Sequence, residues 1–146
     1  MTVFTIGFTK KTAREFFSLI NKNNIDFLID VRLNNKTQLA GFTKGDDLCF
    51  FLNELCNCEY KHCDNLAPTK ELLNAYQEKK IDWDKYEKQY KTLINERGNI
   101  DSFFEDCAKY NNIALLCSEP TANHCHRRLL AELICKSYPN LVVKHI

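Results

Sequence analysis

The segment between Leu116 and Arg128 holds the densest group of reactive side chains in the sequence. It follows an apolar run and precedes a helical pattern, so it is predicted to connect a strand to a helix. Its two thiols, two imidazoles, one carboxylate and two guanidinium groups belong to Cys117, Cys125, His124, His126, Glu119, Arg127 and Arg128. These groups can supply nucleophilic, acid–base, metal-binding and anion-binding chemistry.

The start of the helix in this segment is expected to attract negative charge. Thr121 or Asn123 is predicted to cap the helix, which places Cys125, His126 and Arg127 in its first turns. Free N–H groups and the positive end of the helix dipole favour an anion there. The same field lowers the pKa of a nearby cysteine. The helix start and Arg127 are therefore a candidate phosphate cradle.

Nucleophilic catalysis by a thiolate is one chemistry that fits this segment. Cys117 or Cys125 is then the nucleophile, and a histidine or Glu119 transfers protons. A phosphatase or rhodanese-like loop has an arginine six residues after its cysteine, whereas the sixth residues after Cys117 and Cys125 are Asn123 and Ala131. The sequence therefore excludes that loop but leaves thiol chemistry open.

Metal binding is a second chemistry, because thiols, imidazoles and carboxylates are ligands for zinc or iron. The first candidate set is Cys117, Glu119, His124, Cys125 and His126. The second candidate set is Cys56, Cys58, His62 and Cys63. Neither set has the paired C-x-x-C spacing of a zinc site, so the sequence assigns no metal or other cofactor.

Carboxylate-assisted hydrolysis or transfer at a sugar or nucleotide is a third chemistry. Asp30 or Glu119 is then the working carboxylate, and Arg32 and Arg127 hold phosphate. Asp30 and Arg32 are two residues apart in a predicted strand and point to the same side. A buried ion pair is the alternative interpretation, although such a pair is costly unless it is well partnered. That cost favours a role in the site.

Polar or reactive residues stand at the ends of four predicted strands. In an open parallel sheet, ligands bind beyond the carboxyl ends of the strands. These ends carry Gly7, Asp30 with Arg32, Cys117 with Glu119, and His145. One site at this edge is therefore expected, although a histidine near a terminal strand is often structural.

The elements that must position these residues alternate between strands and helices. The predicted strands are Val3–Ile6, Ile25–Val31, Glu59–Cys63, Ile113–Cys117 and Leu141–Ile146. Helices are expected from Thr12, Asp46, Thr69, Asp82, Ile100 and Thr121, and residues 34–45 are expected to be a loop. This order indicates an α/β fold, with residues 1–146 as one domain. A mostly parallel sheet of about four to five strands has helices on both faces, in three layers.

The composition excludes several classes of protein. The 146 residues are 45% hydrophobic and 27% charged, with a net charge of +1, which disfavours disorder and a strongly basic nucleic-acid binder. No signal peptide or membrane-spanning apolar run is found, so a cytoplasmic location with reduced thiols is expected. Cys49, Cys107 and Cys135 lie among apolar residues and are expected to be buried core residues.

Taken in order along the chain, these short motifs resemble domain-of-unknown-function family 488. The resemblance extends from about residue 2 to the end of the chain. It rests on Thr5-Ile-Gly7, Ile29-Asp-Val-Arg32, Leu66-Ala-Pro-Thr-Lys70, Tyr86 and Tyr90, Leu116-Cys-Ser-Glu119, Cys125-His-Arg127 and His145-Ile146. It implies a small bacterial cytosolic α/β protein whose activity is not established.

The resemblance also implies a set of site residues. Most of these residues also stand at the ends of the predicted strands. They are Gly7, Asp30, Arg32, Cys117, Glu119, Cys125, His126, Arg127 and His145. The sequence departs from the family after Arg32, where a small residue and a proline are replaced by Leu33-Asn34-Asn35.

Three functions compete on these observations. The leading hypothesis is an enzyme acting on a small phosphorylated or nucleotide-like anion at the strand ends. The second is a non-catalytic metal- or ligand-binding module that uses Cys117, Cys125 and His126. The third is a nucleic-acid accessory protein, in which lysines contact phosphates and an aromatic helix stacks a base. The residues proposed for these nucleic-acid contacts are Lys10, Lys11, Arg14, the loop 36–44, Trp83, Tyr86 and Tyr90. An aromatic stripe at helical spacing is, however, more often part of the core.

Overall fold

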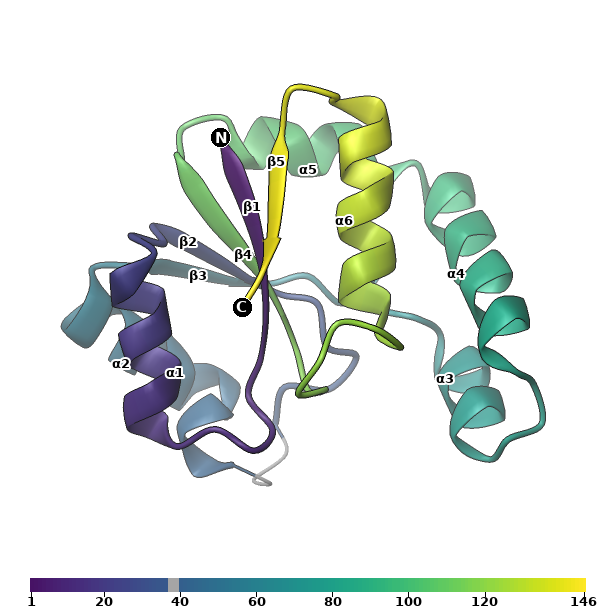
Figure 1. Cartoon of the computed structure of the whole chain (residues 1–146), viewed down its shortest axis with the longest axis horizontal. Coiled ribbons are helices and arrows are strands. Elements are labelled where there is room, and N and C mark those ends of the chain that lie inside the picture. Colours follow the sequence, from purple (N-terminus) through teal and green to yellow (C-terminus); the bar gives the residue numbers. More distant parts are fainter. Residues whose placement is uncertain (37–39) are drawn as a thin grey trace.

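Short apolar runs form a parallel sheet in the computed structural model, which describes residues 1–36 and 40–146. The strands in the described residues are β1 (Thr2–Gly7), β2 (Phe27–Asp30), β3 (Glu59–His62), β4 (Asn112–Cys117) and β5 (Val142–His145). Their order is β3-β2-β4-β1-β5, and every neighbouring pair is parallel. Because β4 lies between β1 and β2, the carboxyl ends of these three strands are adjacent (Figure 1).

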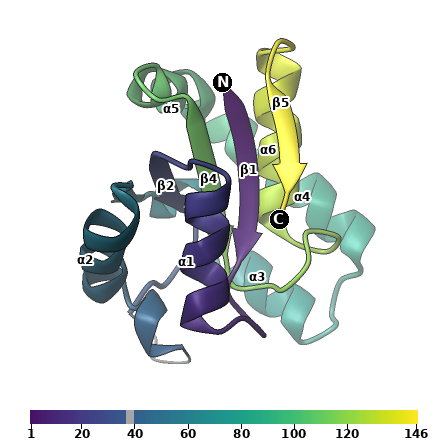
Figure 2. The same cartoon turned by 60° about the vertical axis from the view of Figure 1, so that its left-hand side comes forward.

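Helices cover both faces of the sheet, so the predicted three-layer α/β fold is confirmed. One face carries α1 (Ala13–Lys22) and α2 (Gly45–Cys56). The other carries α4 (Trp83–Arg97), α5 (Asn99–Cys107) and α6 (His126–Ser137), with α3 (Lys70–Gln77) packed against α4. Short 3-10 helices, η1 (Gly41–Thr43) and η2 (Asp64–Leu66), precede α2 and α3. Figure 2 shows the two layers from the side, with β5 at the sheet edge.

The alternation of strand side chains divides the core into two clusters. On β1, Val3 packs with the α4–α6 layer, whereas Phe4 and Ile6 pack with the α1–α2 layer. On β2, Ile29 belongs to the first cluster and Leu28 to the second. Period-2 alternation on strands that are buried on both faces gives this pattern.

Local capping fixes the starts of three helices as expected. Thr12 forms a capping box with Glu15 at α1, and Thr69 and Asp82 accept the capping bonds of α3 and α4. The expected cap at Asp46 is wrong, because α2 begins at Gly45 after Lys44, which makes no side-chain cap bond.

The predicted start of α6 is also wrong. The helix begins at His126 rather than Thr121, and Cys125 precedes it in an extended conformation with φ −140° and ψ 137°. Residues 118–125 therefore form a loop between β4 and α6. Cys125, His126 and Arg127 nevertheless stand at the helix start, as the sequence predicted.

Other expectations are met in part. No helix in the described ranges is long and apolar enough to cross a bilayer. All eight cysteines are unpaired, and Cys107 is buried as expected, but Cys49 and Cys135 are only half-buried. Part of the loop 34–45, with its expected phosphate contacts, falls on residues 37–39, which lie outside the described residues.

Two of the three aromatic residues of the α4 stripe belong to the core, whereas Trp83 is half-buried beside them. Tyr86 and Tyr90 are 2% and 0% exposed, so neither presents a ring face on which a base could stack. The Tyr90 hydroxyl donates a hydrogen bond of 2.7 Å to the Leu66 carbonyl. The structure therefore favours the core interpretation of this stripe.

Replacing Tyr90 with phenylalanine is expected to lower the free energy of unfolding by about 1–2 kcal/mol, because the Leu66 carbonyl loses its buried donor. Urea unfolding followed by circular dichroism measures this change. Tyr138→Phe is the matched control, since its hydroxyl bonds exposed Asp101 and its loss should cost almost nothing. Equal losses in the two variants would contradict the assigned role of the buried bond.

Candidate functional site

The carboxyl ends of β1, β2 and β4 bring together most of the predicted site residues. In the sheet register Gly7 lies opposite Cys117, and Asp30 lies opposite Leu116. The loop 118–125 then returns over the end of β1, where the Thr9 N–H donates to the Ser118 carbonyl at 3.2 Å. This return places Cys125, His126 and Arg127 beside the end of β4.

Cys117 and His126 form a buried pair at the centre of the site. The Cys117 Sγ lies 3.7 Å from the His126 Nδ1, and each residue is 6% exposed. The His126 Nε2 donates to the Val31 carbonyl at 2.9 Å. Because the Nε2–H group donates its hydrogen bond to the Val31 carbonyl, the Nδ1 nitrogen faces the thiol and can accept its proton.

The surroundings favour charge separation between these two side chains. A hydrogen bond from the Cys125 thiol holds the pKa of Cys117 well below its usual value, aided by His126 and the Glu119 backbone N–H against the effect of burial. Burial lowers the pKa of His126, but the charge and hydrogen bond of Cys117 outweigh it, so the net shift is upward. Bonding to Cys117 and burial raise the pKa of Cys125. These directions favour a negative charge on Cys117, a positive charge on His126 and a proton on Cys125.

Arg127 adds a buried positive charge next to this pair. The residue is 1% exposed, and its Nη1 donates to the Glu119 carbonyl at 2.6 Å and to the Cys125 Sγ at 3.7 Å. No carboxylate of the described residues lies within salt-bridge distance of Arg127. Its Nε is buried without a hydrogen-bond partner. Arg127 is therefore a buried guanidinium with one free donor and no carboxylate partner among the described residues.

Gly7 is required by the close approach of the loop to β1. A Cβ atom at this position would lie 1.7 Å from the Glu119 carbonyl oxygen and 2.9 Å from the Arg127 Nη1. Only a residue without a side chain leaves room for the hydrogen bond between these two groups. Gly7 thus allows the loop to lie against the end of β1.

Asp30, the last residue of β2, and Arg32, two residues beyond the strand, form a buried ion pair. The Arg32 Nε and Nη2 donate to the two carboxylate oxygens at 2.8 and 2.6 Å, and Arg32 Nη2 also donates to the Thr43 carbonyl at 2.7 Å. The Tyr60 hydroxyl donates to Asp30 at 2.8 Å. Asp30 is fully buried, so this geometry favours the ion-pair interpretation over a catalytic carboxylate. Only the Arg32 Nη1 is left without a partner.

Glu119 and His145 lie at the rim of the site. The Glu119 side chain is exposed and lines a pocket of about 650 Å³. Its other lining residues are Tyr76, Thr121, Asn123, His124 and Arg128. The His145 Nδ1 bonds the Thr5 hydroxyl at 2.7 Å, and burial, Arg127 and Arg128 lower the pKa of its ring. His145 is thus held by the sheet near Arg127, without contact with the thiols.

Cys117, Cys125 and His126 also have the spacing of metal ligands. Their ligand atoms lie within 4.8 Å of one another, and all three residues are buried. The bond from His126 to the Val31 carbonyl orients the ring as a backbone carbonyl orients metal-bound histidines. In the described part of the chain, Cys56, Cys58, His62 and Cys63 form no such cluster.

Two groups in this site were missed in the sequence. The Val31 carbonyl orients His126, but a backbone atom has no residue-type signal. Tyr60 donates to Asp30 from the neighbouring strand β3, and only the strand order reveals that contact. The available signal was an aromatic residue, Tyr60, in a predicted strand, and such a residue is equally typical of the core.

Comparison with known proteins gives one finding. A family model described as "Domain of unknown function DUF488" matches residues 12–134. Searches of curated proteins and of solved structures each found no match.

Proposed function

The chain belongs to the DUF488 family, and on that premise we propose that it is an enzyme that uses the Cys117 thiolate as a nucleophile on a small anionic substrate. The single observation that carries this proposal is the buried Cys117–His126 pair, fixed by the Val31 carbonyl. A cysteine beside a histidine that a third group orients is the arrangement of an activated nucleophile.

The residues of the pair divide the chemistry between them. The Cys117 sulfur forms a bond to an electrophilic centre of the substrate, and the leaving group departs with the proton of the His126 Nδ1. His126 then accepts a proton from water as the water displaces the sulfur, which restores the thiolate and the imidazolium. The Glu119 N–H and Cys125 stabilise the thiolate between turnovers.

The charges of the site support an anionic substrate. The His126 imidazolium and the Arg127 guanidinium carry two positive charges, whereas the Cys117 thiolate carries one negative charge. Buried charges need partners, and an anion beside Arg127 would balance the excess. The polar pocket at Glu119, His124 and Arg128 adjoins the loop 118–125 and is the proposed binding place. Because Cys117 is 6% exposed, only a small group of the substrate reaches the sulfur.

Alkylation with iodoacetamide, followed by peptide mass spectrometry from pH 5.5 to 9.5, tests the thiolate. A thiol with a pKa near 8.5 is expected to react about 50-fold more slowly at pH 6.5 than at pH 8.5. A lowered pKa means that Cys117 stays deprotonated as the pH falls, so its rate should change less than about 3-fold over this range. Half-buried Cys49 in the same sample serves as the internal reference.

His126→Asn is expected to move the pH profile of Cys117 toward that of an ordinary thiol, because the imidazolium no longer stabilises the thiolate. His124→Asn is the matched control, since His124 is exposed and stacks on Trp83 rather than on the thiols. A Cys117 profile that follows Cys49 in the unmodified protein would refute the thiolate, and a His126→Asn profile that equals the original would refute the pair.

Zinc binding by Cys117, Cys125 and His126 is the second candidate function, and it rests on the spacing of their ligand atoms. Two thiolates and one imidazole fit the ligand preference of zinc, and three protein ligands leave a fourth position for water or substrate. In this case Cys125 loses its proton on binding the metal. Zinc would then act as a Lewis acid, while Val31 keeps His126 oriented.

Elemental analysis of the purified protein separates the two functions. The thiol enzyme should be metal-free and should be alkylated at Cys117 without a chelator. The zinc protein should hold about one zinc ion per chain, lose it in Cys125→Ser, and become reactive at Cys117 only after chelation. Added zinc that leaves the alkylation rate of Cys117 unchanged would eliminate the metal candidate.

A further inference from the structure

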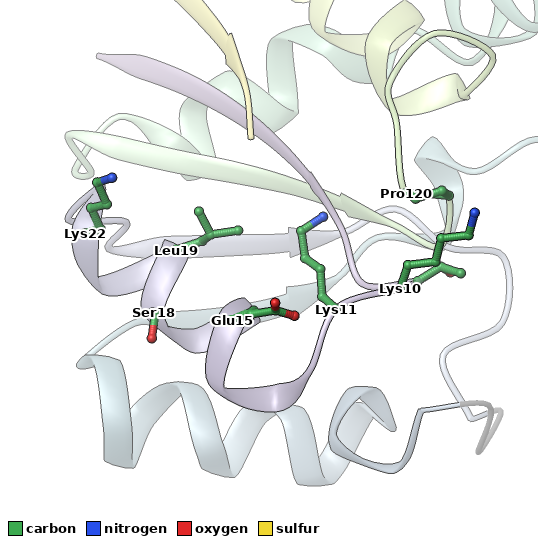
Figure 3. Close-up of a pocket in the computed structure, with 8 residues that line it drawn as sticks. Lys10, Lys11, Glu15, Ser18, Leu19, Lys22 and Pro120 are labelled. Carbon is green, nitrogen blue, oxygen red and sulfur yellow. The ribbon is translucent and has the colours of Figure 1, made fainter.

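A second pocket lies on the opposite side of the loop 118–125, between that loop and α1. It has a volume of about 500 Å³, and its lining includes Lys10, Lys11, Glu15, Leu19, Lys22 and Pro120. Figure 3 shows Lys11 extending from the chain before α1, with Leu19 on the helix beside it and Lys10 near Pro120. None of these residues belongs to the thiol site.

The charge around this pocket is positive and unbalanced. Lys10, Lys11 and Lys22 have no salt-bridge partner within the described ranges. The one carboxylate of the lining, Glu15, accepts the Thr12 N–H at 2.7 Å in the capping box of α1. That bond uses the carboxylate to cap the helix, so the lining holds three lysines against one carboxylate that is already engaged.

Arg127 extends this positive field beneath the loop. Burial lowers the pKa of Lys11, and the charge of Arg127 lowers it further. The charges of these two cations thus oppose each other, and Arg127 is a buried cation without a carboxylate partner in the described chain. An anion in the pocket would relieve this repulsion.

The floor of the pocket is apolar. Leu19 and Pro120 line it together with lysines, whose side chains carry apolar methylene stems below the ammonium group. A wholly hydrated ion would gain nothing from such a floor, whereas a ligand with an apolar body and a charged end would bury its body against it.

We propose that this pocket is a second ligand site, which binds a small organic phosphate with its phosphate group at Lys10 and Lys11 and its apolar body on Leu19. The dianionic phosphate matches several ammonium groups better than a single carboxylate does. The lining of this pocket shares no residue with the proposed substrate pocket at Glu119, His124 and Arg128, so the two proposals can be tested separately.

Isothermal titration with phenyl phosphate and with inorganic phosphate, at constant ionic strength, tests this site. We expect phenyl phosphate to bind more tightly than inorganic phosphate. Lys11→Gln should weaken both by about 10-fold, because a charged hydrogen bond is lost. Leu19→Ser should weaken phenyl phosphate about 5-fold or more and leave inorganic phosphate unchanged. If Leu19→Ser does not fold, Lys10→Gln, which should weaken both ligands as Lys11→Gln does, takes its place.

Lys136→Gln, at the exposed end of α6, is the matched control because it removes the same charge away from the pocket. Equal weakening by Lys136→Gln and Lys11→Gln would overturn the proposal, since binding would then follow net charge alone. No binding of phenyl phosphate at millimolar concentration would overturn it as well. The pH profile of Cys117 alkylation, measured on Lys11→Gln, reports the thiolate separately, so failure of one proposal is distinguishable from failure of the other.

Discussion

Replacing Asp30 with asparagine is expected to lower the free energy of unfolding by about 3–5 kcal/mol, because the change leaves the charge of Arg32 buried without a counter-charge. Arg32 is 3% exposed and cannot turn to water without unpacking the end of β2. The Arg32 Nη2 also holds the Thr43 carbonyl, so the turn before α2 is expected to loosen with it. Urea unfolding of both proteins at neutral pH measures the loss.

The exposed pair of Lys61 and Asp106 provides the control for this measurement. Their side chains are 49% and 54% exposed, so Asp106→Asn should cost less than about 1 kcal/mol. The double variant Asp30→Leu, Arg32→Met removes both buried charges and should recover much of the loss. An Asp30→Asn variant no less stable than Asp106→Asn would show that the buried pair contributes little. Asp30 would then again be a candidate for the catalytic carboxylate.

The helix starts show which parts of the fold the sequence could predict. Thr12, Thr69 and Asp82 cap their helices through bonds to residues three positions along the chain, and such local bonds leave a local pattern. The first residue of α2 instead donates its N–H to the Asn35 carbonyl at 2.8 Å, beyond the reach of any capping motif. The capping interaction expected of Asp46 is therefore made by a backbone atom that is distant in the sequence.

The order of the strands in the sheet also could not be predicted from the sequence. Continuous apolar runs correctly predicted buried parallel strands, because both faces of β2 and β4 are covered by helices. The same runs gave no sign that β4 inserts between β1 and β2. That insertion brings Cys117 beside Gly7, and it depends on pairing between strands far apart in the sequence, which leaves no local signal.

The site residues were predictable by type and position but not by role. The rule that ligands bind beyond the strand ends selected Cys117, Asp30 and Gly7 together. Their surroundings in the fold separate them, since Cys117 contacts an imidazole, Asp30 is paired with Arg32, and Gly7 leaves space for the loop. Roles of this kind depend on contacts between atoms far apart in the sequence, which one sequence alone does not encode in a readable pattern.

Gly7→Ala is expected to lower the free energy of unfolding by about 1–3 kcal/mol, because the new methyl group would overlap the Glu119 carbonyl and force the loop away from β1. The Glu119 N–H belongs to the same stretch of backbone and helps to hold the pKa of Cys117 down. Displacing it should raise that pKa. Urea unfolding measures the first effect, and the pH profile of Cys117 alkylation measures the second.

Gly41→Ala separates this steric effect from the general effect of losing a glycine. A Cβ at Gly41 meets nothing within 4 Å, so alanine there should cause no strain. It should be neutral or stabilise the protein by about 0.4–1 kcal/mol, because alanine lowers the conformational entropy of the unfolded chain. If Gly7→Ala were as stable as Gly41→Ala, the loop would have moved without cost, and the hydrogen bond from Arg127 to the Glu119 carbonyl would not be what fixes the site. If Gly7→Ala lost stability but kept the alkylation profile of Cys117, His126 and Cys125 alone would account for the thiolate, and the loop would serve only the fold.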